Sequence, residues 1–223
     1  VPEYKEEINK TTYIASHGSC SWMFEVDSLR EQTPFNLQWV PPSFLDIICN
    51  WDYVSKEDFN HFDTLWKEKR DNEIAGTTLP ETVADRGIQL GREENDDRLI
   101  SHFKQPHAPY VCGAYTEDRE PTELEVSPFS FVQNEDTRED VWNAYLQELR
   151  WGLESVGKIL ENYDAEKVVI TADHGELFGR YLHSHPIGFP HPKLMRVPWV
   201  VTRARDTKTH TPTQNSDLSQ ENS

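Results

Sequence analysis

Residues 145–176 read YLQELRWGLESVGKILENYDAEKVVITADHGE. This stretch decides the fold, because it predicts most of a long helix, a strand and an acidic turn. Apolar side chains recur at steps of three or four between Val141 and Leu160, which predicts one helix with a buried stripe over residues 137–163. Residues 167–171 (KVVIT) are rich in β-branched side chains, which predicts a strand covered on both faces. The turn after this strand consists of Asp173, His174, Gly175 and Glu176.

Strands and helices alternate along most of the chain. Their patterns predict strands at residues 11–15, 98–103 and 197–202, and helices at residues 56–72 and 79–92. Strands separated by crossover helices indicate an α/β fold with a largely parallel sheet sandwiched by helices.

Three further stretches lack regular periodicity or are mainly polar. Residues 4–9 are polar and compatible with a helix, and residues 34–52 mix prolines with aromatic side chains, which predicts an irregular packed excursion. From Arg205 onward the chain is polar without periodicity. The expected organisation is one α/β domain at 1–204 followed by a disordered tail at 205–223.

The charge balance excludes two classes of partner. The chain carries 39 acidic and 22 basic residues, a formal net charge of -17, so it repels nucleic acid phosphates and anionic membranes. Two interpretations of this acidity stay open. The protein is either an ordinary acidic cytoplasmic protein or one adapted to high salt. The lysine content weakens the second interpretation, because proteins adapted to extreme salt tend to be poor in lysine. Cys20, Cys49 and Cys112 show no CxxC spacing, which favours reduced, buried thiols and a cytoplasmic location.

The turn after residues 167–171 is the first candidate site. Ligands of open α/β sheets bind at the carboxyl ends of the strands. Asp173 and His174 offer a hard oxygen and a borderline nitrogen to one divalent ion, and Gly175 allows the sharp turn that brings them together. The same dipeptide is equally compatible with Asp173 capping a following helix and His174 being merely exposed.

Residues 145–176 resemble the sulfatase-like hydrolases of the alkaline phosphatase superfamily. In that family a long helix with a Tyr and a mid-helix Gly leads through a strand into a DHGE or DNGE motif, and Tyr145, Gly157 and the ADHGE of residues 172–176 occupy those places. Downstream, residues 183–186 (HSHP) and 196–199 (RVPW) match the family's basic residue and RVP-type strand. Haloarchaeal members share the TxYI strand and the PHxPY loop as well.

The resemblance implies roles for several histidines. His107, in the HFKQPHAPY of residues 102–110, is expected to bind the sulfate or phosphate group or to act as the leaving-group acid. His185 is expected to contact the transferred group, with His183 as a substitute substrate-binding residue and His191 as the weakest candidate. His102 is expected to be structural. The alternatives are a loop histidine without chemistry at position 107 and an adventitious metal-binding loop around the later histidines.

The resemblance also implies a metal ion. Asp173 and His174 are expected to hold one divalent ion (Ca, Mn, Mg or Zn), with Glu176 supporting the ligands from behind or capping the next helix. In the family, an Asp-rich strand that completes the metal site and the nucleophile come earlier in the chain. None of the three cysteines lies in the C/S-x-P-x-R setting of formylglycine. The chain is therefore expected to be an N-terminally incomplete sulfatase-like domain.

These observations lead to three hypotheses about function. The first is a metal-dependent hydrolase of small anionic sulfate or phosphate esters. The second is a phospho-group transferase of the same superfamily. The third, from another class, is a non-catalytic remnant that binds an anion or a partner protein.

Overall fold

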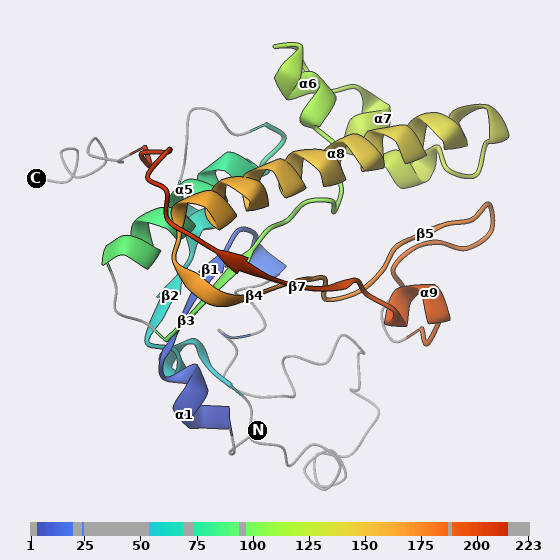
Figure 1. The fold of residues 1–223 in the computed structure, drawn as a ribbon. Coiled ribbons are helices and arrows are strands. Elements are labelled where there is room, and N and C mark those ends of the chain that lie inside the picture. The colour runs from blue at the N-terminus through green and yellow to red at the C-terminus, as the bar shows by residue number, and fades with distance from the viewer. Residues whose placement is uncertain are drawn as a thin grey trace, which may run out of the picture.

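The described residues form a three-stranded parallel sheet and two antiparallel strand pairs, with helices packed against them (Figure 1). The structure is a computed structural model that describes residues 4–19, 24, 54–68, 74–93, 97–186 and 189–213. The strands are β1 (Thr11–Ala15), β2 (His61–Asp63), β3 (Arg98–His102), β4 (Ala165–Thr171), β5 (Leu177–Phe178), β6 (His183–Ser184) and β7 (Trp199–Ala204). The helices are α1 (Lys5–Ile8), α5 (Pro80–Glu93), α6 (Cys112–Thr116), α7 (Glu123–Val126), α8 (Glu135–Asn162) and α9 (Pro192–Met195), with 3-10 turns at Lys56–Asp58, Leu65–Lys67 and Pro128–Ser130.

Strand β1 is the centre of the parallel sheet. The order is β2-β1-β3, and all five residues of β1 are buried. Ile14 packs with Val83 of α5 on one face, and Tyr13 packs against Phe62 and other aromatic rings on the opposite face. A strand of apolar and threonine side chains buried on both faces is what a parallel sheet requires. The predicted strand at 11–15 and the α/β class with parallel strands are confirmed.

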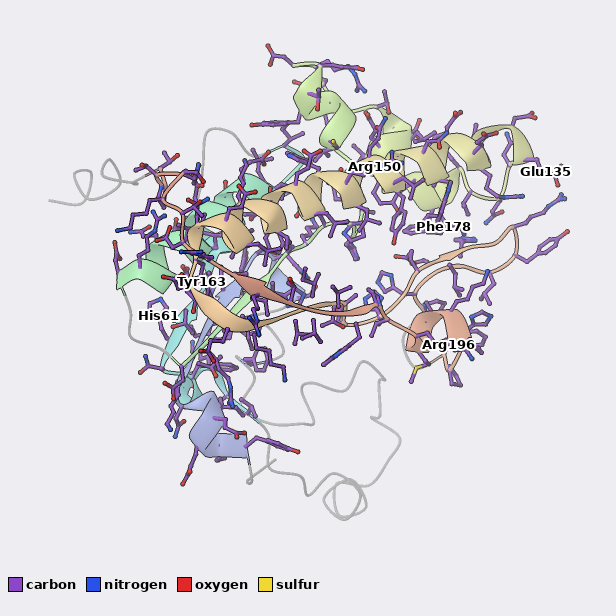
Figure 2. The ribbon with its side chains drawn as sticks, in the orientation of Figure 1. His61, Glu135, Arg150, Tyr163, Phe178 and Arg196 are labelled. Atoms are coloured by element: carbon purple, nitrogen blue, oxygen red, sulfur yellow. The ribbon has the colours of Figure 1, made fainter. Side chains whose placement is uncertain are left out.

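Helices α5 and α8 lie side by side (Figure 1), and both are predicted correctly. The side chain of Asn134 caps α8 by accepting a hydrogen bond from the Asp136 backbone N–H at 3.0 Å. Tyr163 ends α8 and leads directly into β4 (Figure 2). Among the described residues, every helix is too short or too polar to traverse a lipid bilayer.

Strand β4 is placed correctly along the chain, but its predicted surroundings are wrong. It pairs antiparallel with β7 instead of extending the parallel sheet. No residue of β4 is buried, and the apolar side chains of Val169, Val200 and Val201 are exposed to solvent. A β-branched run favours the extended backbone whether or not both faces are covered, so the run did not specify the partner.

The predicted helix at residues 56–72 is wrong over the part that the structure describes, 56–68. There the chain forms a 3-10 turn, the short strand β2 and a second 3-10 turn. Phe59 and Phe62 pack against Tyr13, whereas Leu65 belongs to the cluster on the other side of the sheet. The apolar spacing therefore reflects contacts with both faces of β1. The predicted excursion at 34–52, together with Cys20 and Cys49, lies outside the described residues.

Residues 205–213 are held against α5 and the end of α8. Arg92 donates two hydrogen bonds to the carboxylate of Asp206, at 3.0 and 2.8 Å. The backbone N–H of His210 donates to Asn162 Oδ1 at 2.8 Å, and its imidazole lies 2.6 Å from Asp85 Oδ1. The disorder expected from Arg205 onward therefore does not begin there. Residues 214–223 lie outside the described part of the chain.

Candidate functional site

Five histidines from the ends of strands β1, β3, β4 and β6 and from one loop gather in one place. His17 follows β1, His102 ends β3, His107 lies in the next loop, His174 follows β4 and His185 follows β6. We refer to these five residues as the imidazole cluster. Ring centres are 5.6 Å apart for His102 and His17, 6.3 Å for His17 and His107, 5.1 Å for His107 and His185, and 4.3 Å for His185 and His174. The carboxyl ends of β1, β3 and β4 thus open onto one site, as expected in α/β proteins.

The structure brings together three of the histidines that the sequence singled out. His107, His174 and His185 come from three loops that are distant in sequence, yet His185 has ring contacts with both of the others. The three loops therefore meet, as the expected roles of these histidines at one site require. The chemical roles assigned to them remain predictions.

His183 and His191 pack elsewhere. The ring of His183 stacks on Phe129, with ring centres 6.2 Å apart, and its Nδ1 is buried without a hydrogen-bond partner. His191 caps α9 by accepting a hydrogen bond from the Lys193 backbone N–H, and its ring stacks on Phe189. In the described residues, both rings therefore pack on phenylalanines.

His17 and His102 belong to the site, although the sequence interpretation gave His17 no role and treated His102 as structural. The hydroxyl of Tyr13 and His102 Nδ1 are 2.5 Å apart, which fixes the orientation of that ring. Burial lowers the pKa of His102, and burial followed by repulsion from His102, Lys104 and His107 lowers the pKa of His17 to about 4. Both rings are neutral at pH 7. Their position at the ends of two predicted strands was the available signal.

Three more rings of the cluster are anchored through Nδ1, as His102 is. Nδ1 of His107 donates to the carbonyl of Ala108 at 2.6 Å, and Nδ1 of His174 donates to the carbonyl of Gly175 at 2.8 Å. Nδ1 of His185 lies 2.9 Å from Glu176 Oε2. In each case Nε2 is the ring nitrogen that remains to bind a ligand.

Charge distinguishes two of these rings. Burial lowers the pKa of His107, whereas the hydrogen bond to the Glu176 carboxylate raises the pKa of His185. Glu176, whose side chain is only 9% exposed, therefore holds His185 and not the expected ligands Asp173 and His174. Strand β5 follows it, so the alternative of capping a helix is wrong as well.

The turn at Asp173 fits a divalent cation by its donor chemistry. The Asp173 side chain is 63% exposed, and its Oδ2 lies 3.8 Å from His174 Nε2. The alternative that Asp173 caps a helix is wrong, because strand β5 follows the turn. As the side chains stand, the described part of the chain contains no group of three or more His, Cys, Asp or Glu side chains that could hold a metal ion.

Gly175 is required by a close approach to α9. A Cβ at this position would lie 1.9 Å from the carbonyl oxygen of Lys193, and the Gly175 N–H donates to the carbonyl of Leu194 at 2.9 Å. We expect Gly175→Ala to lower the free energy of unfolding by about 1–3 kcal/mol, the usual cost of forcing an atom into a packed position. Denaturant unfolding measures the change.

Gly157 provides a matched control for this substitution. It lies inside α8, and a Cβ there would meet nothing within 4 Å. Gly157→Ala is expected to raise the free energy of unfolding by about 0.5–1 kcal/mol, because alanine favours the helix. If both substitutions stabilise the protein, Gly175 is not held against α9 in the way described.

Comparisons of this chain with protein-family models, with curated proteins and with solved structures find no match.

Proposed function

We propose that this chain carries the metal- and anion-binding part of a hydrolase of sulfate or phosphate esters, with a fold of the alkaline phosphatase superfamily. One observation carries the proposal: the Asp173–His174 turn and the rings of His107 and His185 meet at the carboxyl ends of the strands. The residues that meet are the ones on which the resemblance to sulfatase-like hydrolases rests.

Each residue has a distinct task in the proposed reaction. The Asp173 carboxylate and His174 Nε2 hold a divalent cation. When bound there, the cation would supply positive charge to polarise the sulfuryl or phosphoryl oxygen and to activate the attacking group. The Nε2 atoms of His107 and His185 face the substrate, because their Nδ1 atoms are engaged by Ala108 and Glu176. They stabilise charge on the non-bridging and leaving oxygens as it develops.

A direct assay tests the proposal. The protein at its full encoded length is stripped of metal and incubated with p-nitrophenyl sulfate, p-nitrophenyl phosphate and bis-p-nitrophenyl phosphate. Each substrate is tested with Ca²⁺, Mn²⁺, Mg²⁺ and Zn²⁺ in turn. We expect nitrophenol release that requires a metal ion and stops on chelation. Absence of release from all three esters with all four ions would overturn the proposal.

A second candidate is the non-catalytic binding of an anion. The observation that favours it is that no three side chains of the described residues are already placed to share a metal ion. This candidate predicts that sulfate or phosphate binds without any ester turnover, and that binding weakens when His107 is replaced by glutamine. Calorimetric titration of the metal-free protein with each anion separates the two functions.

A further inference from the structure

A cavity of about 630 Å³ lies among helices α5, α6 and α8 and opens to solvent. Helices α5 and α6 both pack against α8 (Figure 1). The side chains that give the cavity its chemistry are Glu81 of α5, Tyr115 of α6, and Arg150, Trp151 and Glu154 of α8. None of the residues that line it belongs to the imidazole cluster or to the acidic turn. The volume lies in the range of about 300–1,000 Å³ in which proteins bind small molecules.

An aromatic pair gives the cavity a fixed apolar wall. The indole of Trp151 packs with Leu79 and Val111, and its Nε1 donates a hydrogen bond to Glu81 Oε1 at 2.5 Å. Tyr115 stacks on Trp151, with ring centres 4.9 Å apart and ring planes at 26°. Tyr115 is 39% exposed, so part of its ring remains open. Because Trp151 supports the Tyr115 ring, the cavity offers a planar surface on which a second aromatic ring can stack.

Two opposite charges lie beside this wall. Arg150 and Glu154 are exposed and lie four residues apart on α8, which places them on one side of the helix and about 6 Å apart along its axis. Side chains at this spacing commonly form ion pairs, yet among the described residues neither Arg150 nor Glu154 has an ion-pair partner. The guanidinium and the carboxylate are therefore both available to a ligand.

The carboxylates around the cavity favour a cationic group. Oε2 of Glu81 is buried without a hydrogen-bond partner in the described residues. Cys112 also lines the cavity, and burial raises the pKa of its thiol to about 11. The charges of three carboxylates, Glu148, Glu154 and Glu81, add to this rise. Negative charge therefore prevails beside Cys112, where an ammonium group is favoured.

We propose that this cavity binds a small aromatic zwitterion, in which an ammonium group and a carboxylate are attached to a planar ring, as in a free aromatic amino acid. The ring stacks on Tyr115, the ammonium group pairs with Glu154, and the carboxylate pairs with Arg150. This binding site is separate from the proposed ester hydrolysis, and neither proposal depends on the other.

Calorimetric titration of the full-length protein with three indole compounds tests the inference. Tryptophan carries both charges, tryptamine lacks the carboxylate, and indole-3-propionate lacks the ammonium group. We expect tryptophan to bind in the micromolar to millimolar range and each truncated compound to bind about threefold to fivefold less tightly, because each loses one exposed ion pair. Absence of tryptophan binding, or a truncated compound that binds as tightly as tryptophan does, would overturn the inference. This comparison uses the unmutated protein, so it does not depend on the folding of any variant.

Substitution of the two exposed charges tests whether the zwitterion binds in this cavity. Arg150→Gln is expected to abolish the preference for tryptophan over tryptamine, and Glu154→Gln the preference for tryptophan over indole-3-propionate. Arg203→Gln in β7 and Glu139→Gln in α8 are the matched controls, because they remove the same charges outside the cavity and should leave both preferences unchanged. If Arg150→Gln and Glu154→Gln also keep both preferences, the ligand binds elsewhere and the inference is wrong.

Discussion

Replacement of Asp173 by alanine is expected to abolish ester hydrolysis by the full-length protein. The other carboxylate of the turn, Glu176, is engaged by His185, so without Asp173 the proposed cation keeps only His174 at this turn. Changes behind a metal ligand cost roughly 10–100-fold in metal affinity or activity, and loss of a ligand itself should exceed that range. The measurement is kcat/KM for the best of the three nitrophenyl esters, at saturating metal.

Folding should be unaffected by this substitution. The Asp173 side chain is 63% exposed, and within the described residues its polar contacts are with His174. We therefore expect the free energy of unfolding to change by no more than about 0.5 kcal/mol. Asp140→Ala is the matched control, because it removes the same charge from an exposed position of α8 and should leave kcat/KM unchanged. Turnover of Asp173→Ala at the wild-type rate would refute the assignment.

The two long helices, α5 and α8, were predicted correctly from their apolar periodicity. The apolar periodicity specified the bounds of α8 almost to the residue, but not its buried face. The stripe that is buried consists of Val141, Glu148, Trp151, Gly152, Ser155 and Asn162, whereas Leu153, one of the periodic apolar residues, is exposed. The helix predicted at 56–72 is wrong over 56–68 because Phe62 and Leu65 pack on opposite faces of β1. Contacts with two different faces produced the same apolar spacing as one face of a helix. Periodicity reports burial, and it identifies a helix only when all buried residues share one surface.

The pairing of β4 with β7 could not be predicted from the apolar pattern, for a different reason. The β-branched run of β4 specifies an extended backbone, but its pairing with Trp199–Ala204 depends on which segments meet in space. The candidate site shows the same limit. His107, His174 and His185 stood out through the motifs around them, whereas His17 carries no motif and joins the site only because β1 is the central strand.

The carboxyl group of Glu148 is expected to contribute more to the stability of the protein as the pH falls from 8 to 5. This side chain of α8 is fully buried, with an exposed fraction of 0%, and its Oε2 accepts a hydrogen bond from the Cys112 backbone N–H at 2.9 Å. Burial raises the pKa of Glu148 from 4.5 to about 7, although the backbone hydrogen bond and the charge of Lys104 oppose the rise. Glu125 adds a small repulsion.

The sign of the effect follows from the direction of the shift. Because the folded protein binds the proton of Glu148 more tightly than the unfolded chain does, protonation stabilises the fold. The stabilisation is complete below pH 4.5 and is lost as the pH rises through about 7. The difference between 4.5 and about 7 corresponds to about 3 kcal/mol between the ends of this window.

Glu148→Gln isolates this contribution. Glutamine keeps an acceptor for the Cys112 N–H but does not ionise, so the variant should gain up to about 3 kcal/mol relative to the wild type as the pH rises from 5 to 8. Glu154→Gln, at an exposed position of the same helix, should follow the wild type at every pH. Denaturant unfolding at pH 5, 6, 7 and 8 gives the three curves. Parallel curves of the free energy of unfolding against pH for the wild type and Glu148→Gln would contradict the prediction. They would mean that Glu148 ionises equally in the folded protein and in the unfolded chain.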